Sequence, residues 1–302
     1  MQNIELIDLY PKCPCCGSFR NKVRVLNKQS EPEEVSDIWC NTGFGRYFFD
    51  YSECADCGLL FVKRYPKPSF LPYLYNLLGD NIYSKNENAH QKTMNGYERI
   101  VRRYLGSLEG MRILELGPDI GTLCKQIHKY HDVNEYFLIE PNKKMHERLA
   151  SISKKNKNIS NVENEKHKLD DGSVDLIIMI HVLDHLVDPK GSLAKLLKKL
   201  KPGGCLFSVT HNHKSPLRYL MRENWPPFCM HHPQLFSKTS KEFMFKQMGV
   251  NQVVAGNTTN YFPVGFYLSG VLGLLKINVE LNWGPDLPIS VGNIFYLGKK
   301  VS

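Results

Sequence analysis

The stretch that most constrains the fold spans residues 113–125 and reads ILELGPDIGTLCK. Its first four residues are typical of a buried strand, and the residues from Thr122 onward favour a helix. Between the two lie Gly117, Pro118 and Gly121, which a strand does not carry through its middle. A strand that stops at a glycine loop and leads directly into a helix predicts one unit of a parallel sheet, with a ligand held at the loop.

The same alternation of strands and helices continues along the chain. Apolar residues at helical spacing predict a helix over residues 86–108, ahead of the glycine loop, and another over 122–130, behind it. Strands are predicted within residues 112–116, 135–140, 174–186, 201–210, 251–258 and 293–300, the third of which runs on into a helix. The fold class that this pattern indicates is α/β, with a Rossmann-like, doubly wound, mostly parallel sheet that carries helices on both faces.

Several polar residues fall at the carboxyl ends of these strands, where sheets of this kind bind ligands. Gly117 and Gly121 let the backbone approach a ligand closely, and the helix that follows offers free N–H groups. Asp119 occupies the place of a middle glycine in the loop of nicotinamide enzymes. Glu140 lies about twenty residues downstream, where a carboxylate can accept hydrogen bonds from ribose hydroxyls. The loop and the acid together predict a site for a nucleoside-bearing cofactor.

Two cysteine pairs near the N-terminus have the spacing of metal ligands. CPCCG supplies Cys13 and Cys16, and CADCG supplies Cys54 and Cys57, each pair being followed by glycine. Such a turn aims both thiolates at one ion, and four thiolates form the tetrahedral set that zinc prefers. We therefore predict a structural zinc site, although the gap between the pairs exceeds the roughly 15–20 residues usual for this pattern.

The remaining cysteines do not suggest a disulfide framework. The chain has nine cysteines, an odd number, and its first residues, MQNIELIDLY, lack the features of a secretory signal. Cys15 and Cys40 are alternatives to one of the four named ligands. We expect a cytoplasmic protein with a zinc-ribbon module in residues 1–65. A larger domain is expected in residues 66–302, with a helical lead-in and a C-terminal lid or insertion.

Charge and hydropathy limit the partners of the chain. The only long apolar run, residues 261–277, is interrupted by one proline and three glycines, so we expect a buried helix or helical hairpin and no membrane span. The net charge of +9 permits binding of nucleic acid or another anion. The lysines of the chain are scattered, however, and those within residues 195–201 are typical of the solvated face of a helix. A solvated face is therefore favoured over a phosphate-binding patch.

Four motifs together resemble those of class I S-adenosylmethionine-dependent methyltransferases. They are ELGPDIG, LIEP, DLIIMIHVLDHLVDP and LKPGG, and the resemblance covers roughly residues 90–300. The cysteine pairs that precede these motifs restrict the resemblance to bacterial methyltransferases with an N-terminal zinc-binding module. Some members of that group methylate sugars on carbon or oxygen. The resemblance implies S-adenosylmethionine as the cofactor, beside the structural Zn²⁺.

The resemblance also implies which residues hold the cofactor. The glycine loop and the strand before it would contact the methionine part and the ribose, through Glu115, Gly117, Asp119 and Gly121. Glu140 would hold the ribose hydroxyls, and His181 would lie beside the sulfonium. The adenine contact would come from Glu163 or Asn164.

Methyl transfer from a sulfonium requires alignment of donor and acceptor and removal of a proton from the acceptor. Histidine suits the second task because its pKa is near ~6.5. His181 lies at a strand end, whereas His185, one helical turn later, is expected to cap or pack its helix. His211 and His213 are expected in a loop without chemistry.

The segment PPFCMHHPQLFS leads to a helix whose N-cap is Ser237 or Thr239. Relatives that methylate sugars on carbon carry tyrosine, any residue, glutamate and histidine here. In this chain Cys229 replaces the tyrosine, His231 replaces the glutamate and His232 keeps the histidine. His232 is the first candidate for the general base, with His181 and His231 as the other catalytic candidates.

Three functions follow from these features. The first is methylation of a hydroxyl or carbon of a small-molecule acceptor, and the favoured acceptor is a nucleotide-linked sugar or polysaccharide precursor. Lys214, Arg218 and Arg222 would receive its diphosphate or serve as surface charges. The alternatives are a zinc-ribbon RNA methyltransferase and a catalytically inactive binding protein with the same fold. The oligomeric state stays open, and the apolar run serves as a lid, a dimer contact or an acceptor pocket.

Overall fold

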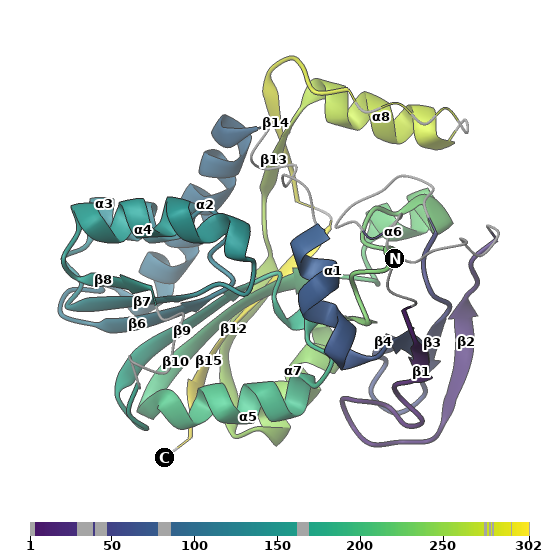
Figure 1. Cartoon of the computed structure of the whole chain (residues 1–302), viewed down its shortest axis with the longest axis horizontal. Coiled ribbons are helices and arrows are strands. Elements are labelled where there is room, and N and C mark those ends of the chain that lie inside the picture. The colour runs from purple at the N-terminus through teal and green to yellow at the C-terminus, as the bar shows by residue number, and fades with distance from the viewer. Residues whose placement is uncertain are drawn as a thin grey trace.

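A seven-stranded sheet with helices on both faces forms the larger part of the molecule, and small antiparallel sheets form the rest (Figure 1). The structure is a computed structural model. It describes residues 4–28, 39, 47–77, 86–161, 169–274, 277, 279, 281–290 and 292–301. The predicted residues Cys40, Glu163 and Asn164 lie outside these ranges.

The large sheet has the strand order β12-β15-β10-β9-β6-β7-β8. Its strands are β6 (Arg112–Leu116), β7 (Glu135–Ile139), β8 (Ile159–Asn161), β9 (Val174–Ile180), β10 (Leu200–His211), β12 (Val250–Asn257) and β15 (Asn293–Lys300). The five strands from β10 to β8 run parallel, whereas β15 is antiparallel to both of its neighbours. The predicted Rossmann-like, mostly parallel sheet is therefore confirmed.

Helices cover both faces of this sheet (Figure 1). The helices are α2 (Glu87–Leu105), α3 (Thr122–Tyr130) and α4 (His146–Lys155) on one face, and α5 (Pro189–Lys199) and α7 (Lys238–Gln247) on the other. Successive residues of a strand point to opposite faces. Ile113 accordingly joins the apolar cluster that contains Tyr97 of α2, and Leu114 joins the cluster that contains Leu193 of α5.

The N-terminal region folds around short strands. They are β1 (Leu6–Asp8), β2 (Asn21–Val25), β3 (Tyr51–Cys54), β4 (Leu60–Val62) and β5 (Arg64–Pro66), followed by α1 (Leu71–Leu77). A segment from far along the chain completes the four-stranded sheet β11-β4-β3-β2, because β11 (Gln234–Leu235) pairs with β4. Helix α6 (Pro216–Met221) precedes this segment.

One apolar core joins the N-terminal sheet to the segment around α6 and β11. Trp225, Phe228 and Leu235 pack in one buried cluster with Tyr51 and Leu60 of the N-terminal sheet. The ring of Phe228 lies 5.4 Å from that of Tyr51. The cysteine-bearing sheet is therefore packed directly against the chain that leads to His231 and His232.

Two local predictions differ from the structure. The segment after β9 is the short 3-10 helix η4 (Leu183–His185), because Asp188 and Pro189 begin the next helix only three residues later. The apolar run forms part of β13 (Asn260–Pro263) and then α8 (Val264–Leu274), before β14 (Asp286–Ile289).

The apolar run forms the predicted helix, but that helix is only partly buried. The side chains of Leu268 and Val271 are 39% and 56% exposed, whereas Ser269 is buried. The β13–β14 hairpin carries α8 away from the large sheet (Figure 1). No helix in the described ranges is both long enough and apolar enough to cross a bilayer.

Replacement of Trp225 tests the shared core. Trp225→Ala removes a side chain that is 1% exposed, and we expect a loss of about 3–5 kcal/mol in the free energy of unfolding. Trp283 is 56% exposed, so Trp283→Ala is the control, with an expected change within about 0.5 kcal/mol. Denaturant unfolding followed by circular dichroism measures both. Equal losses in the two variants would contradict the shared core.

Candidate active site and cysteine cluster

The glycine loop between β6 and α3 has the backbone shape that its sequence predicts. Gly117 and Gly121 have φ angles of +67° and +72°, a region that favours glycine. A Cβ atom at Gly117 would lie 2.6 Å from Cγ2 of Val182, and one at Gly121 would lie 2.6 Å from Cδ1 of Ile152. Both positions therefore require glycine for conformation and for space.

Glu140 fixes the loop in place from the neighbouring strand. Its Oε2 accepts a hydrogen bond from the backbone N–H of Asp119 at 3.0 Å, and its Oε1 accepts one from Asn142 at 2.8 Å. The backbone N–H of Gly117 also donates to the carbonyl of Ile139 at 2.8 Å. A carboxylate has about four lone-pair sites, so Glu140 keeps capacity for two ligand hydroxyls.

Glu115 is a buried acid beside the loop. The hydroxyl of Tyr136 donates to its Oε2 at 2.7 Å, and burial raises the pKa of Glu115 to about 7. Burial also raises the pKa of Glu140 above its usual value. A cationic group of a ligand placed here would favour the ionised form of Glu115.

A cavity of about 240 Å³ opens at the carboxyl ends of β6, β7 and β9. Six predicted site residues line it: Glu115, Gly117, Asp119, Glu140, His181 and His231. Gly121 and His232 do not line it, although both lie next to residues that do. Sequence reasoning missed Tyr75 of α1 and His90 and Met94 of α2 as lining residues. The signal for the last two was the predicted helix directly ahead of the glycine loop.

Five histidines gather at one end of this cavity, and we call them the histidine cluster: His181, His185, His211, His231 and His232. Ring centroids of neighbouring members lie 4.2 to 5.1 Å apart. Three come from segments that follow β9 or end β10, and two come from the segment before β11. His185 and His211, for which no chemistry was predicted, thus belong to the same group.

Burial keeps the histidine cluster uncharged. It lowers the pKa of His181 to about 3 and that of His232 to about 4. The pKa values of His185, His211 and His231 are lowered well below the usual value by burial and by the neighbouring imidazoles. Neutral imidazoles can accept a proton or bind a metal, so the cluster is in a chemically competent form.

His232 has a defined tautomer. Its Nδ1 lies 2.7 Å from the carbonyl oxygen of Pro227, which can only accept, so Nδ1 carries the hydrogen and Nε2 has the lone pair. The hydroxyl of Tyr51 donates to the backbone carbonyl of His232 at 2.7 Å. The N-terminal sheet therefore holds the segment that carries this histidine.

His231 differs from His232 because neither ring nitrogen has a hydrogen-bond partner among the described residues. Its ring packs instead against Tyr75, Trp39 and His185, at centroid distances of 4.8, 5.5 and 4.2 Å. A polar group of a ligand in the cavity would satisfy these nitrogens.

The other predicted residues of this region serve the packing. Nε2 of His213 lies 2.9 Å from the carbonyl oxygen of Gly58, and Lys214 forms an ion pair with Glu53. The guanidinium of Arg218 lies over the ring of Phe228. Neither lysine nor arginine is found among the described residues that line the cavity. Ser237 is the N-cap of α7, one of the two alternatives predicted.

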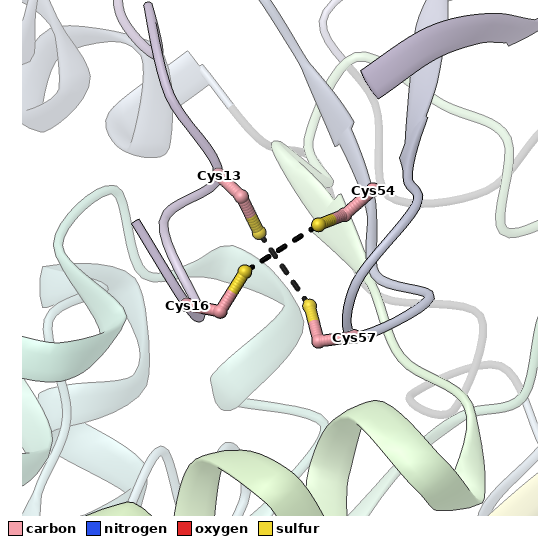
Figure 2. A group of neighbouring side chains, drawn as sticks. All are labelled: Cys13, Cys16, Cys54 and Cys57. Carbon is pink, nitrogen blue, oxygen red and sulfur yellow. Dashed lines mark hydrogen bonds between the residues drawn. The ribbon is translucent and has the colours of Figure 1, made fainter. Parts of the chain in front are cut away.

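The two cysteine pairs converge on one point (Figure 2). Sγ of Cys13 lies 3.6 Å from that of Cys57, and Sγ of Cys16 lies 3.4 Å from that of Cys54. A tetrahedron of sulfur atoms around zinc, with Zn–S bonds near 2.3 Å, has edges of about 3.8 Å. The four thiols therefore fit a zinc ion.

The local turns explain why these cysteines face one another. The N–H of Gly17 donates to the carbonyl of Cys13 at 2.8 Å, and that of Gly58 donates to the carbonyl of Cys54 at 3.0 Å. Cys15 is buried elsewhere, with its Sγ 3.6 Å from the carbonyl oxygen of Ser240. It is not part of the group of four.

Metal analysis of the purified protein tests this cluster. We expect about one zinc per chain in the parent, because four thiolates close the coordination sphere of the ion. Cys54→Ser is expected to lose the metal and to unfold at a lower temperature, while Cys205→Ser, a half-buried cysteine outside the cluster, keeps both. Zinc bound equally by the two variants would exclude the cluster as the site.

Comparisons with known proteins agree with this geometry. A protein-family model described as a methyltransferase domain matches residues 88–254, more than half of the 302 residues. The comparison with curated proteins found no match.

Two solved structures resemble the chain in fold. One is a chain of the complex that contains the Haloferax volcanii Trm112 methyltransferase activator, at 12% identity and a TM-score of 0.54, covering 73% of this chain and 96% of that one. The other is an S-adenosylmethionine-dependent methyltransferase from Aquifex aeolicus, at 15% identity and a TM-score of 0.50, covering 74% of this chain and 100% of that one. The chain therefore belongs to the methyltransferase-domain family and carries the domain of an S-adenosylmethionine-dependent methyltransferase.

Proposed function

We propose that the protein transfers a methyl group from S-adenosylmethionine to a hydroxyl or carbon of a small-molecule acceptor, in the class of nucleotide-linked sugars or polysaccharide precursors. The observation that carries this proposal is one cavity with two chemically different ends. Glu115, Gly117 and Glu140 line one end, and His181 and His231 line the other. The first end suits the cofactor, and the second suits an acceptor that must lose a proton.

The residues at the first end would divide the cofactor between them. Glu140 would receive the ribose hydroxyls, and Glu115 the ammonium of the methionine part. Asp119 and the two loop glycines would bring the backbone close to the ligand, with Gly121 acting through the shape of the loop. In the same proposal His181 lies beside the sulfonium, and the adenine contact stays a prediction for Glu163 or Asn164, outside the described residues.

The residues at the second end would accept the proton of the acceptor. Bound S-adenosylmethionine supplies a methyl group that is already a strong electrophile. The lone pair of the acceptor forms the new bond to the methyl carbon, the C–S electron pair stays on sulfur, and the proton goes to a neutral imidazole. His231 and His232 are our candidates for that imidazole, since His231 lines the cavity and His232 lies behind it with a free lone pair.

The position of the exposed lysines favours a small acceptor over RNA. Lys125, Lys129, Lys155 and Lys157 surround an open depression at the ends of α3 and α4. These helix ends lead into β7 and β8, so the depression lies at the amino edge of the parallel strands. The cavity lies at the carboxyl edge, and RNA held at the lysines would be on the opposite side of the sheet.

Transfer of labelled methyl groups tests the proposal. The purified protein is incubated with methyl-labelled S-adenosylmethionine and separate pools of nucleotide sugars and of RNA. We expect label in the nucleotide-sugar pool and none when Glu140→Ala replaces the parent. Label in RNA would show the alternative activity. Uptake of cofactor without transfer to either pool would support an inactive binding protein.

Cofactor uptake tests the role of Glu140. Glu140→Gln removes a charged acceptor, and we expect binding of S-adenosylmethionine to weaken about 10- to 100-fold, the range of a hydrogen bond to a charged group. Glu135→Gln is the control, because Glu135 lies at the other end of β7 and pairs with Arg112. Titration calorimetry measures both constants. Equal affinities in the two variants would remove Glu140 from the cofactor site.

The pH dependence of kcat tests the proton acceptor. The base must be neutral, and burial lowers the pKa of His232 to about 4, with His185, His211, His231 and Cys229 facing it. We therefore expect kcat to stay constant from about pH 8 to about pH 6 and to fall only below about pH 5. A midpoint near 6.5 would contradict the assignment, as would parent-level kcat in each of His231→Asn and His232→Asn.

A further inference from the structure

The ends of three neighbouring strands bring the side-chain amide of Asn293 beside the rings of two histidines. His181 follows β9, His211 ends β10 and Asn293 begins β15, where it pairs in register with His211. The two rings stack at a centroid distance of 4.4 Å and an angle of 28°. The side chain of Asn293 reaches both rings: its Oδ1 lies 2.9 Å from Nδ1 of His211, and its Nδ2 lies 3.3 Å from Nε2 of His181.

The chemistry of the amide determines where each imidazole carries its hydrogen. Oδ1 only accepts, so Nδ1 of His211 is the protonated nitrogen and its Nε2 has the lone pair. Nδ2 only donates, so Nε2 of His181 has the lone pair and its Nδ1 carries the hydrogen. Rotation of the amide by half a turn would instead place the hydrogen on Nε2 of both rings, a state that nitrogen NMR distinguishes from the first.

We propose that Asn293 is a positioning residue that holds both His181 and His211 in the Nδ1–H tautomer, so that His181 presents an N–H, and no lone pair, at the cavity. The inference rests on the proposed methyl transfer and refines it. His181 then donates a hydrogen bond to an oxygen of the acceptor, which assigns the acceptor to compounds with oxygen on or beside the methylated atom. The proton itself goes to another member of the histidine cluster.

The surroundings of His181 support a donor that awaits a ligand. Its Nδ1 is buried and has no hydrogen-bond partner among the described residues, and the same holds for Oδ1 of Asp184. A buried N–H without a partner is costly, so a ligand oxygen there would be favoured. His181 also has a φ angle of +53°, a strained conformation for a residue other than glycine.

The same residues include a candidate metal-binding group. His181, Asp184 and His211 have ligand atoms within 4.8 Å of one another, a two-histidine, one-carboxylate set that binds transition metals. Metal analysis therefore belongs to the test of the inference.

Nitrogen NMR of the ¹⁵N-histidine-labelled protein tests the inference, because protonated and unprotonated imidazole nitrogens have distinct shifts. His181→Gln and His211→Gln assign the signals. We expect Nδ1–H on His181 and Nδ1–H on His211, with opposite ends of the two rings facing the amide. In Asn293→Asp, whose carboxylate only accepts, Nε2 of His181 gains a hydrogen. Asn257→Asp adds the same charge at an exposed position of the neighbouring strand and leaves both rings unchanged.

Kinetics provide a second readout. Asn293→Asp is expected to lower kcat at least about tenfold, a conservative value for loss of a preorganised donor, with cofactor affinity unchanged. A hydrogen on Nε2 of either ring in the parent would overturn the inference. So would parent-level kcat in Asn293→Asp, or a second equivalent of divalent metal that His211→Gln loses. Failure of the proposed function would show itself differently, as a parent protein that takes up no cofactor.

Discussion

The active-site architecture depends on the carboxylate of Glu140 accepting hydrogen bonds from two backbone N–H groups. One comes from Asp119 in the glycine loop and one from Asn142 after β7. These bonds tie the ends of two neighbouring parallel strands together, and they place Gly117 close enough to Val182 that no side chain fits. The cavity lies where these constrained segments meet, so the backbone fixes the part of its wall that the glycine loop forms.

The second constraint is the packing of the N-terminal sheet against the chain around His232. Tyr51, three residues from a cysteine of the cluster, donates to the carbonyl of His232, and β11 pairs with β4 directly after this segment. A metal ion at the cysteines would stabilise the turns that begin and end these strands. The cysteine cluster is thus connected to the histidine cluster through a few buried contacts, and none of its cysteines lines the cavity.

Local pattern was enough to predict the large sheet except for the three-residue β8, since the other strands contain apolar runs and the glycine loop has a shape that few residues allow. The same holds for the cysteine turns, which depend on short spacings and a following glycine. The pairing of β11 with β4 joins residues far apart in the chain, and no local pattern encodes it. His185 and His211 were assigned to packing and to a loop for the same reason. His211 stacks on His181 because β9 and β10 are neighbours in the sheet, and His185 meets His231 and His232 from the distant segment before β11. The partial exposure of α8 was missed because apolar composition predicts burial, whereas the β13–β14 hairpin removes the helix from the core.

In the proposed reaction, burial of the histidine cluster would have two opposed effects. It keeps the imidazoles neutral near pH 7, because charging any of them would cost desolvation and repulsion from its neighbours. The same lowered pKa makes each imidazole a weak base. The donor already carries a reactive methyl group, so a weak base is sufficient if the acceptor is held in line and its developing charge is stabilised. A fixed N–H from His181, set by Asn293, would supply that stabilisation, and the division of labour between donor and base explains why several histidines are gathered at one cavity.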